Sequence, residues 1–232
     1  MPDIPPILDR RKQVHSFSSL NTYLNCPHQY EGRYVTKATP FTGSDASRYG
    51  DRVHEAMEKR IGQGTPLPVE FAQWESFAAP FDNLPDTFHV RVEQQYAITI
   101  DGAACDYWAP TAWFRGRLDL TVVSPDFQTA YILDHKSGKP WEKPLELETS
   151  AMLLKSRHPD LTTINGQYFW ARENKLGKLY DLSDVVGTFR YVQTLVSEIE
   201  RDVKLRTFEK RVTGLCPWCP RKDCENHPEH RS

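Results

Sequence analysis

Two predicted strands each carry one carboxylate inside an otherwise apolar run, and this pair of acids most constrains the fold of the chain. One strand, 113–123, carries Asp119 between two leucines, and the next, 129–135, carries Asp134 after Ile and Leu. The connection at 124–128, Ser-Pro-Asp-Phe-Gln, consists of turn residues. The pattern therefore predicts an antiparallel hairpin with both acids inside apolar strands.

The register of this hairpin predicts where the acids lie. If Val123 pairs with Ala130 across the turn, Asp119 falls opposite Asp134, and Lys136 shares their face because side chains alternate along a strand. Two buried carboxylates are unfavourable unless a cation compensates them, and oxygen ligands suit Mg²⁺ or Mn²⁺. Such an ion activates water for phosphodiester hydrolysis, while a lysine orients that water or stabilises charge on phosphorus. The alternative is a surface hairpin whose acids are simply exposed.

The remaining pattern predicts an α/β fold with a mixed central sheet flanked by helices. Residues 1–15, with three prolines, are expected to form a flexible arm, and 16–232 a single domain. The predicted helices cover about 16–34, 44–63, 143–156 and 183–206, and the further strands cover 88–100, 164–171 and a short segment near Leu179.

Four short motifs occur in order along the chain. They are Phe17 to Tyr30 with Cys26-Pro27, Gly50-Asp-Arg-Val-His54-Glu-Ala-Met-Glu58, Gly116-Arg-Leu-Asp119, and Asp134-His-Lys136-Ser-Gly138. Together they resemble the motifs of PD-(D/E)XK nucleases of the RecB-like branch, including CRISPR-adaptation and phage-type exonucleases that carry an iron–sulfur cluster. The resemblance spans residues 16–224 and implies a restriction-endonuclease-like core.

The resemblance also implies roles for individual residues. His54, Asp119, Asp134 and the backbone carbonyl of His135 are expected as ligands of a catalytic metal, within about residues 50–156. Asp119 and Asp134 are expected to act in catalysis together with Lys136, which matches the catalytic lysine of the family.

The helix after the last motif departs from the family pattern. Relatives carry Q-L-x-x-Y-A there, whereas this chain has Glu146-Leu-Glu-Thr-Ser150-Ala. Glu146 is either an additional carboxylate of the metal site or an exposed helix residue. Glu146, Ser150 and Glu58 are expected to support the site or to contact DNA.

The five cysteines are unevenly distributed. Cys216, Cys219 and Cys224 follow one another at short spacing, whereas Cys105 stands alone and is assigned no role. An odd number of cysteines in a chain without an export signal disfavours a disulfide framework and favours thiolates that bind a metal or a cluster.

The fourth ligand of the cysteine group has two candidate solutions. The resemblance implies Cys26, which gives four thiolates for a [4Fe–4S] cluster joining residue 26 to 216–224. The alternative is Zn²⁺ held by the three C-terminal cysteines with His227 or His230.

Charge and hydropathy limit the class of protein. The formal net charge is −2, so no bulk positive field attracts nucleic acid, and no apolar run reaches the ~18 residues of a membrane span. We expect a cytoplasmic, metal-dependent DNA nuclease of a bacterial or phage-infected cell. It would act as an exonuclease on ends or single strands in recombination, repair, replication or CRISPR spacer acquisition, settings that also allow for a protein partner. The alternatives are a non-catalytic nucleic-acid-binding or scaffold module and a zinc-binding protein.

Overall fold

The computed structural model describes residues 13–39 and 43–230. The chain divides into two compact units. Residues 43–189 form one, the sheet unit, and residues 1–42 together with 190–232 form the other, the terminal unit. Both chain ends therefore contribute to the terminal unit. No helix in the described part of the chain is long and apolar enough to cross a membrane.

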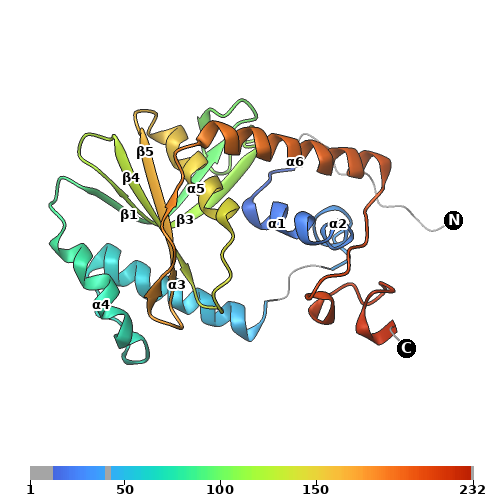
Figure 1. The fold of residues 1–232 in the computed structure, drawn as a ribbon, viewed down its shortest axis with the longest axis horizontal. Coiled ribbons are helices and arrows are strands. Elements are labelled where there is room, and N and C mark those ends of the chain that lie inside the picture. The colour runs from blue at the N-terminus through green and yellow to red at the C-terminus, as the bar shows by residue number, and fades with distance from the viewer. Residues whose placement is uncertain (1–12, 40–42, 231–232) are drawn as a thin grey trace. The chain divides into compact units, whose positions relative to one another are not determined.

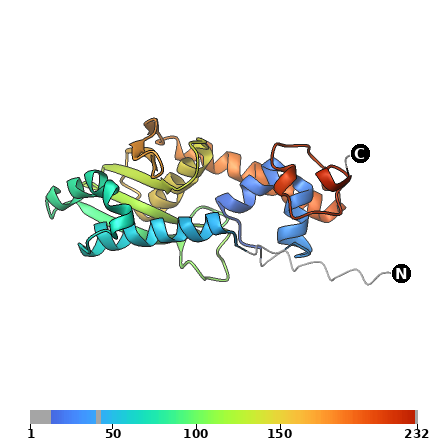
Figure 2. The ribbon, with the colours of Figure 1, turned by 90° about the horizontal axis from the view of Figure 1, so that it is seen from below.

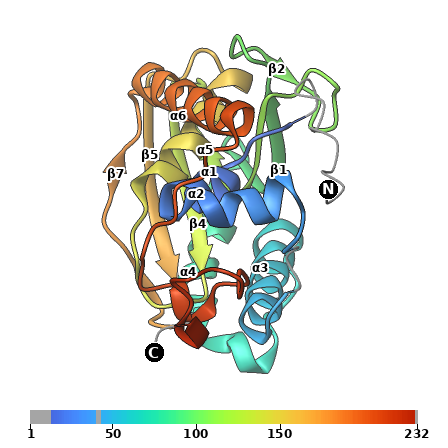
Figure 3. The same ribbon diagram turned by 90° about the vertical axis from the view of Figure 1, so that its right-hand side faces the viewer.

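The sheet unit is built on one seven-stranded mixed sheet (Figure 1). Its strands are β1 (His89–Ile98), β2 (Ala104–Cys105), β3 (Phe114–Val123), β4 (Thr129–Lys136), β5 (Thr163–Trp170), β6 (Lys175–Leu176) and β7 (Tyr180–Asp181). The order is β2-β1-β3-β4-β5-β6, with β7 also paired to β5. Figure 3 shows β2 and β7 at opposite sides of the sheet. Only β4 and β5 pair in parallel, and a helix connects them, as a parallel connection requires.

The central hairpin forms in the predicted register. Val123 pairs with Ala130, and the ladder between β3 and β4 continues to Leu120 and Leu133. Ser124 stabilises the turn because its hydroxyl donates to Asp126 at 2.6 Å. The predicted α/β class with a mixed central sheet is thereby confirmed.

Two helices flank the sheet, α3 (Asp45–Gln63) and α5 (Pro144–Arg157). The sequence explains both ends of α3: Ser44 caps its first turn through a capping box, and Gly64 ends it with a left-handed φ of 68°. Figure 2 shows α3 lying along the strands. The helix α5 starts with proline at its first position, where no backbone N–H is needed.

The segment between α3 and β1 folds into short helical turns. They are η3 (Val69–Trp74), α4 (Glu75–Ala78) and η4 (Ala79–Asn83). Trp74 is fully buried here, stacks on Phe71 at a centroid distance of 4.5 Å, and donates its indole N–H to the carbonyl of Ala171 at 2.7 Å. This contact fixes the turns against the end of β5.

The prediction of one continuous helix over 16–34 is wrong at Cys26. A proline disfavours helical geometry in the residue that precedes it, and Cys26 precedes Pro27. Cys26 is extended, with φ −160° and ψ 109°, and separates two helices. The observed elements are α1 (Phe17–Asn25), α2 (Pro27–Tyr30) and the π-helical turn η2 (Glu31–Val35). Cys26 therefore belongs to a bend and not to a helix.

The terminal unit contains most of α6 (Val185–Leu205), which begins in the sheet unit, and the short turns η5 (Cys216–Trp218) and η6 (Pro228–His230). Within it, the hydroxyl of Tyr23 donates to the carboxylate of Asp202 at 2.6 Å, which joins α1 to α6. Residues 1–12 of the expected arm lie outside the described residues. The last of the arm, His15, differs from expectation because it is only 2% exposed.

Candidate active site

Asp119 lies where β3 and β4 separate. The last backbone pair of the two strands is Leu120 with Leu133. One residue further, Oδ2 of Asp119 accepts a hydrogen bond from the backbone N–H of His135 at 2.7 Å. A carboxylate thus takes the place of a backbone acceptor, and the opened ladder leaves room for side-chain chemistry.

His54 reaches Asp119 from α3. Its Nδ1 lies 3.3 Å from Oδ1 of Asp119 and 3.2 Å from Oε1 of Glu93. Burial alone would lower the pKa of His54, but the hydrogen bonds to Asp119 and Glu93 raise it to about 10. Burial alone would raise the pKa of Asp119, but the hydrogen bond and charge of His54 hold it at about 2. Without a metal ion, the pair is a half-buried imidazolium–carboxylate contact at neutral pH.

Glu93 is a site residue that sequence reasoning missed. It lies on β1 between the pairs Val92–Leu120 and Gln94–Leu118, and its φ is 50°, in the left-handed region that a glutamate seldom occupies. Besides His54, it contacts Nη1 of Arg117 at 3.2 Å. No motif marks Glu93; only the register of β1 against β3, which places it beside Asp119, could have found it.

Asp134 and Lys136 form the second half of the site. The Nζ of Lys136 lies 2.5 Å from Oδ2 of Asp134 and 3.1 Å from Oε1 of Glu146 on α5. Burial raises the pKa of Asp134 well above its ordinary value; Lys136 opposes this, and the carboxylates of Glu146 and Asp119 add to it. Burial alone would lower the pKa of Lys136, but Asp134 and Glu146 raise it. The lysine is therefore a fixed cation.

The ring of His135 also belongs to the site. One ligand atom of each of His54, Asp119 and His135 lies within 4.8 Å of the others, a group that could hold a metal ion. Burial lowers the pKa of His135 to about 4, so the imidazole is neutral, as a metal ligand must be. Its buried Nε2 has no hydrogen-bond partner among the described residues. Sequence reasoning expected only the backbone carbonyl of this residue as a ligand.

An open cleft of about 480 Å³ leads to His54, Glu93 and Asp119. Carboxylates dominate its lining, and one arginine joins them; the lining is Asp51, His54, Glu55, Glu58, Glu93, Arg117 and Asp119. Glu58, expected to support the site, thus faces the cleft. A cleft lined by one sign of charge concentrates cations.

The structure places Ser150 and Glu146, both expected to support the site, in different surroundings. Glu146 contacts Lys136, whereas the Ser150 hydroxyl donates to the Glu146 carbonyl at 3.0 Å within α5. The Ser150 hydroxyl therefore makes its hydrogen bond within its own helix. Gly50, from the second motif, lies near the site because a Cβ there would stand 3.3 Å from Oγ of Ser137, directly after Lys136.

The cysteines of the terminal unit converge. Cys26, Cys216, Cys219 and Cys224 line one pocket, together with His227. Burial raises the pKa of the Cys219 thiol, and the three other thiols add to this rise. Cys105 lies elsewhere, on β2.

Backbone donors surround the cysteine pocket. The N–H of Thr213 donates to Sγ of Cys216 at 3.3 Å, and the N–H of Arg211 donates to Sγ of Cys26 at 3.5 Å. Such donors stabilise negative charge on sulfur, which thiolate ligands carry. His227 is 6% exposed and lies at the same pocket, so the structure places two of the three candidate fourth ligands, Cys26 and His227, beside the C-terminal cysteines. His230 does not line this pocket, and its Nε2 lies 2.6 Å from the carbonyl oxygen of Lys222.

Comparison with known proteins identifies the family. The sequence model of the PD-(D/E)XK nuclease superfamily matches residues 14–224, nearly the whole chain. The chain belongs to the PD-(D/E)XK nuclease superfamily. The members of this superfamily are nucleases.

Two solved structures resemble this PD-(D/E)XK chain. A protein of Eubacterium rectale named as a candidate exonuclease aligns over 96% of this chain and 94% of its own, with 11% identity and a TM-score of 0.55. The protein SSO0001 aligns over 92% and 86%, with 14% identity and a TM-score of 0.47. At such identity the first likeness supports the fold alone. No curated protein sequence matches the chain.

Proposed function

We propose that this chain is a metal-dependent deoxyribonuclease of the RecB-like branch, acting as an exonuclease on DNA ends or single strands. The observation that carries the proposal is the contact of Lys136 with Asp134, at 2.5 Å, beside the Asp119–His54 pair. Two carboxylates and a lysine in one opened hairpin, with a histidine of α3 beside them, are the groups that metal-assisted phosphodiester hydrolysis needs. We also propose a role in recombination, repair, replication or CRISPR spacer acquisition, with a protein partner, because relatives of the same branch serve in these settings.

The residues present fit a divalent metal. Three ligand atoms converge within 4.8 Å, and the buried Nε2 of His135 has no partner among the described residues. His54, Asp119, Asp134 and His135 would hold Mg²⁺ or Mn²⁺. When bound, such an ion supplies a nucleophilic water at neutral pH and polarises a phosphoryl oxygen.

Lys136 acts as a fixed positive charge in this proposal. Asp134 and Glu146 raise its pKa, so it stays protonated at working pH and does not act as a base. Its Nζ can donate to the scissile phosphate, where negative charge grows in the transition state. Asp134 and Glu146 hold the amine in place from two sides.

For the terminal unit we propose a [4Fe–4S] cluster held by Cys26, Cys216, Cys219 and Cys224. The common pocket and the backbone donors to two of the sulfurs support it. This cluster would join residue 26 to residues 216–224. In this proposal, residues 16–232 form a single nuclease domain. Bound zinc with neither iron nor sulfide would instead assign the three C-terminal cysteines and His227 to a zinc site.

The test is cleavage of end-labelled single- and double-stranded DNA by anaerobically purified protein with Mg²⁺ or Mn²⁺. Asp119→Ala and Lys136→Ala should each lower the rate at least about 100-fold, with the circular dichroism spectrum retained. Asp86→Ala and Lys175→Ala are the charge-matched controls, since both side chains are exposed. Full activity in both site variants contradicts the proposal. DNA binding without any cleavage by the wild type would instead favour a non-catalytic binding module.

A further inference from the structure

A large aromatic side chain is exposed on the connection that follows the proposed catalytic lysine, Lys136. Trp141 is 68% exposed and lies in the connection 137–143, directly after β4 and Lys136. Five residues of chain span at most about 18 Å, so the indole stands within a few nucleotides of Lys136. An exposed tryptophan leaves a large apolar area in water, which is unfavourable unless a ligand covers it.

The connection is fixed to the active-site framework at its second half. The hydroxyl of Tyr168, a fully buried residue of β5, donates to the carbonyl of Lys143 at 2.7 Å, and Nζ of Lys136 lies 5.7 Å from the centroid of the same ring. Tyr168 therefore touches both the catalytic lysine and the connection. The connection that carries the indole is thus held by the same ring that Lys136 contacts.

Glu142 provides a second anchor, next to Trp141. Its carboxylate accepts hydrogen bonds from the backbone N–H of Lys178 at 3.3 Å and from the hydroxyl of Tyr180. Pro140 precedes the tryptophan and restricts the backbone further. The carboxylate beside the indole is therefore engaged by the protein, and the indole is held outward on a pre-organised segment.

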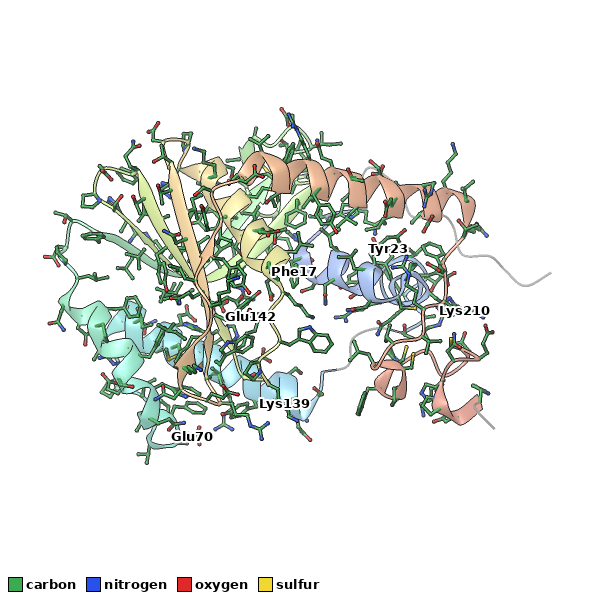
Figure 4. All side chains as sticks on the ribbon, in the orientation of Figure 1. Phe17, Tyr23, Glu70, Lys139, Glu142 and Lys210 are labelled. Atoms are coloured by element: carbon green, nitrogen blue, oxygen red, sulfur yellow. The ribbon has the colours of Figure 1, made fainter. Side chains whose placement is uncertain are left out.

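The charges around the indole suit a nucleic-acid strand. Lys139 is exposed, and Nζ of Lys143 lies 5.7 Å from the indole centroid. Figure 4 labels Lys139 and Glu142 along this connection. A stacking ring with two ammonium groups matches a base and its phosphates. The base must be unpaired, because the faces of paired bases are covered by their neighbours in the duplex.

Another exposed tryptophan of the sheet unit lacks this combination. Trp108 is 74% exposed, but the guanidinium of Arg115 lies over its ring at 4.4 Å from the centroid, closer than the Lys143 ammonium lies over the ring of Trp141 at 5.7 Å. It also follows β2 and not the strand that carries Lys136. Trp108 therefore serves as a matched control.

We propose that Trp141 is a stacking platform for an unpaired base of the strand that enters the active site, with Lys139 and Lys143 contacting its phosphates. This inference rests on the proposed nuclease function, which it extends to single-stranded substrate or a frayed end. It assigns a nucleic-acid subsite to a residue outside the four sequence motifs.

The test measures equilibrium binding, in a full-length Lys136→Ala background that prevents cleavage. Fluorescence anisotropy with a labelled 20-nucleotide single strand is compared for Trp141→Ala, Trp141→Phe and Trp108→Ala. Loss of one stacking contact should weaken binding by roughly 5- to 100-fold in Trp141→Ala. Trp141→Phe should recover most of the affinity, and Trp108→Ala should bind like the parent. A blunt duplex should respond far less to Trp141→Ala.

An abasic oligonucleotide separates stacking from general attraction. Removing the bases should weaken binding to the parent protein but make little difference to Trp141→Ala, because the two changes remove the same contact. Equal binding by Trp141→Ala and the parent overturns the inference, as does an equal loss in Trp108→Ala. If the wild type cleaves no DNA while these binding results hold, the nuclease proposal fails and the stacking subsite stands.

Discussion

The carboxylate of Asp119 accepts a hydrogen bond from the backbone N–H of His135 at 2.7 Å, and Asp119 lies one residue beyond the last backbone pair of β3 and β4. This hydrogen bond replaces a ladder bond and couples the two strands where their acids and the lysine gather. Asp119 also contacts His54 on α3 at 3.3 Å. The site is therefore held by a helix and two strands at once, and its residues respond to one another's charge.

Glu93→Gln should weaken metal binding. The amide keeps a polar contact to His54 but removes the carboxylate that orients its ring, and it takes one negative charge from the cleft that attracts the cation. A residue that orients a metal ligand typically contributes 10- to 100-fold, so we expect kcat/KM to fall by roughly that factor at limiting Mn²⁺. The measurement is a rate series over Mn²⁺ concentration. Glu70→Gln, an exposed carboxylate, is the control; identical metal titrations in the two variants would contradict the role of Glu93.

Metal affinity should rise with pH because His54 must lose its proton to bind a metal. The hydrogen bonds to Asp119 and Glu93 overcome the opposing effect of burial and raise its pKa to about 10, so it is protonated at pH 7. The apparent affinity for Mn²⁺ should therefore increase up to about tenfold per pH unit between pH 7 and 8.5. Calorimetry in buffers of different ionisation enthalpy should detect close to one proton released per ion. A His54→Asn protein that shows the same proton release would disprove this account.

The metal-free protein should lose stability over a related range of pH. Because the pKa of His54 is raised from 6.5 to about 10 on folding, its ion contacts stabilise the folded state fully below pH 6.5. That contribution declines as the pH rises toward 10. Urea unfolding with a chelator at pH 6, 8 and 9.5 should show a steeper loss for wild type than for His54→Asn. Parallel curves would contradict it.

Glu146 should contribute through Lys136, which it contacts at 3.1 Å. Glu146→Ala removes one of the two carboxylates that hold the amine, and we expect kcat/KM to fall about tenfold. Glu146→Gln keeps a hydrogen-bond acceptor and should lose less. Single-turnover cleavage rates measure the effect at the chemical step. An equal loss in both variants would show that charge, and not the position of the amine, is what Glu146 provides.

Cys26→Ser should abolish the brown colour expected of anaerobically purified protein and lower its iron and sulfide content. Cys26 lies at the bend before Pro27 and shares a pocket with Cys216, Cys219 and Cys224. Cys105→Ser is the matched control because this thiol lies on β2, outside that pocket. Metal analysis and the visible spectrum measure the outcome. A coloured Cys26→Ser protein with full iron content would remove Cys26 from the ligand set.

Trp74→Ala should destabilise the protein by about 3–5 kcal/mol, since it removes a fully buried indole and leaves a cavity. It also removes the hydrogen bond to the carbonyl of Ala171. Urea unfolding followed by circular dichroism measures the change. Val69→Ala, at a residue 94% exposed, should change the free energy of unfolding by less than about 0.5 kcal/mol. Similar midpoints for the two variants would show that the turns before β1 do not contribute to the cooperative fold.

The sequence by itself determined the features that depend on near neighbours in the chain. The turn at 124–128 and the apolar runs around it specified the hairpin and its register, and Ser44 and Gly64 specified the ends of α3. Even the bend at Cys26 follows from the next residue, Pro27, although the helical periodicity around it concealed the bend. Local sterics and hydrogen bonds act over a few residues, so a linear reading can detect them.

Only the tertiary structure decided which side chains meet. Glu93 reaches His54 across 39 residues because β1 and β3 pair in one particular register, and the ring of His135 joins the site because β3 and β4 separate there. The anchoring of the connection that carries Trp141 depends likewise on Tyr168 of another strand. Such contacts depend on long-range packing and on the opening of a ladder. The interactions that select them join distant parts of the chain, so no short stretch of sequence reveals them.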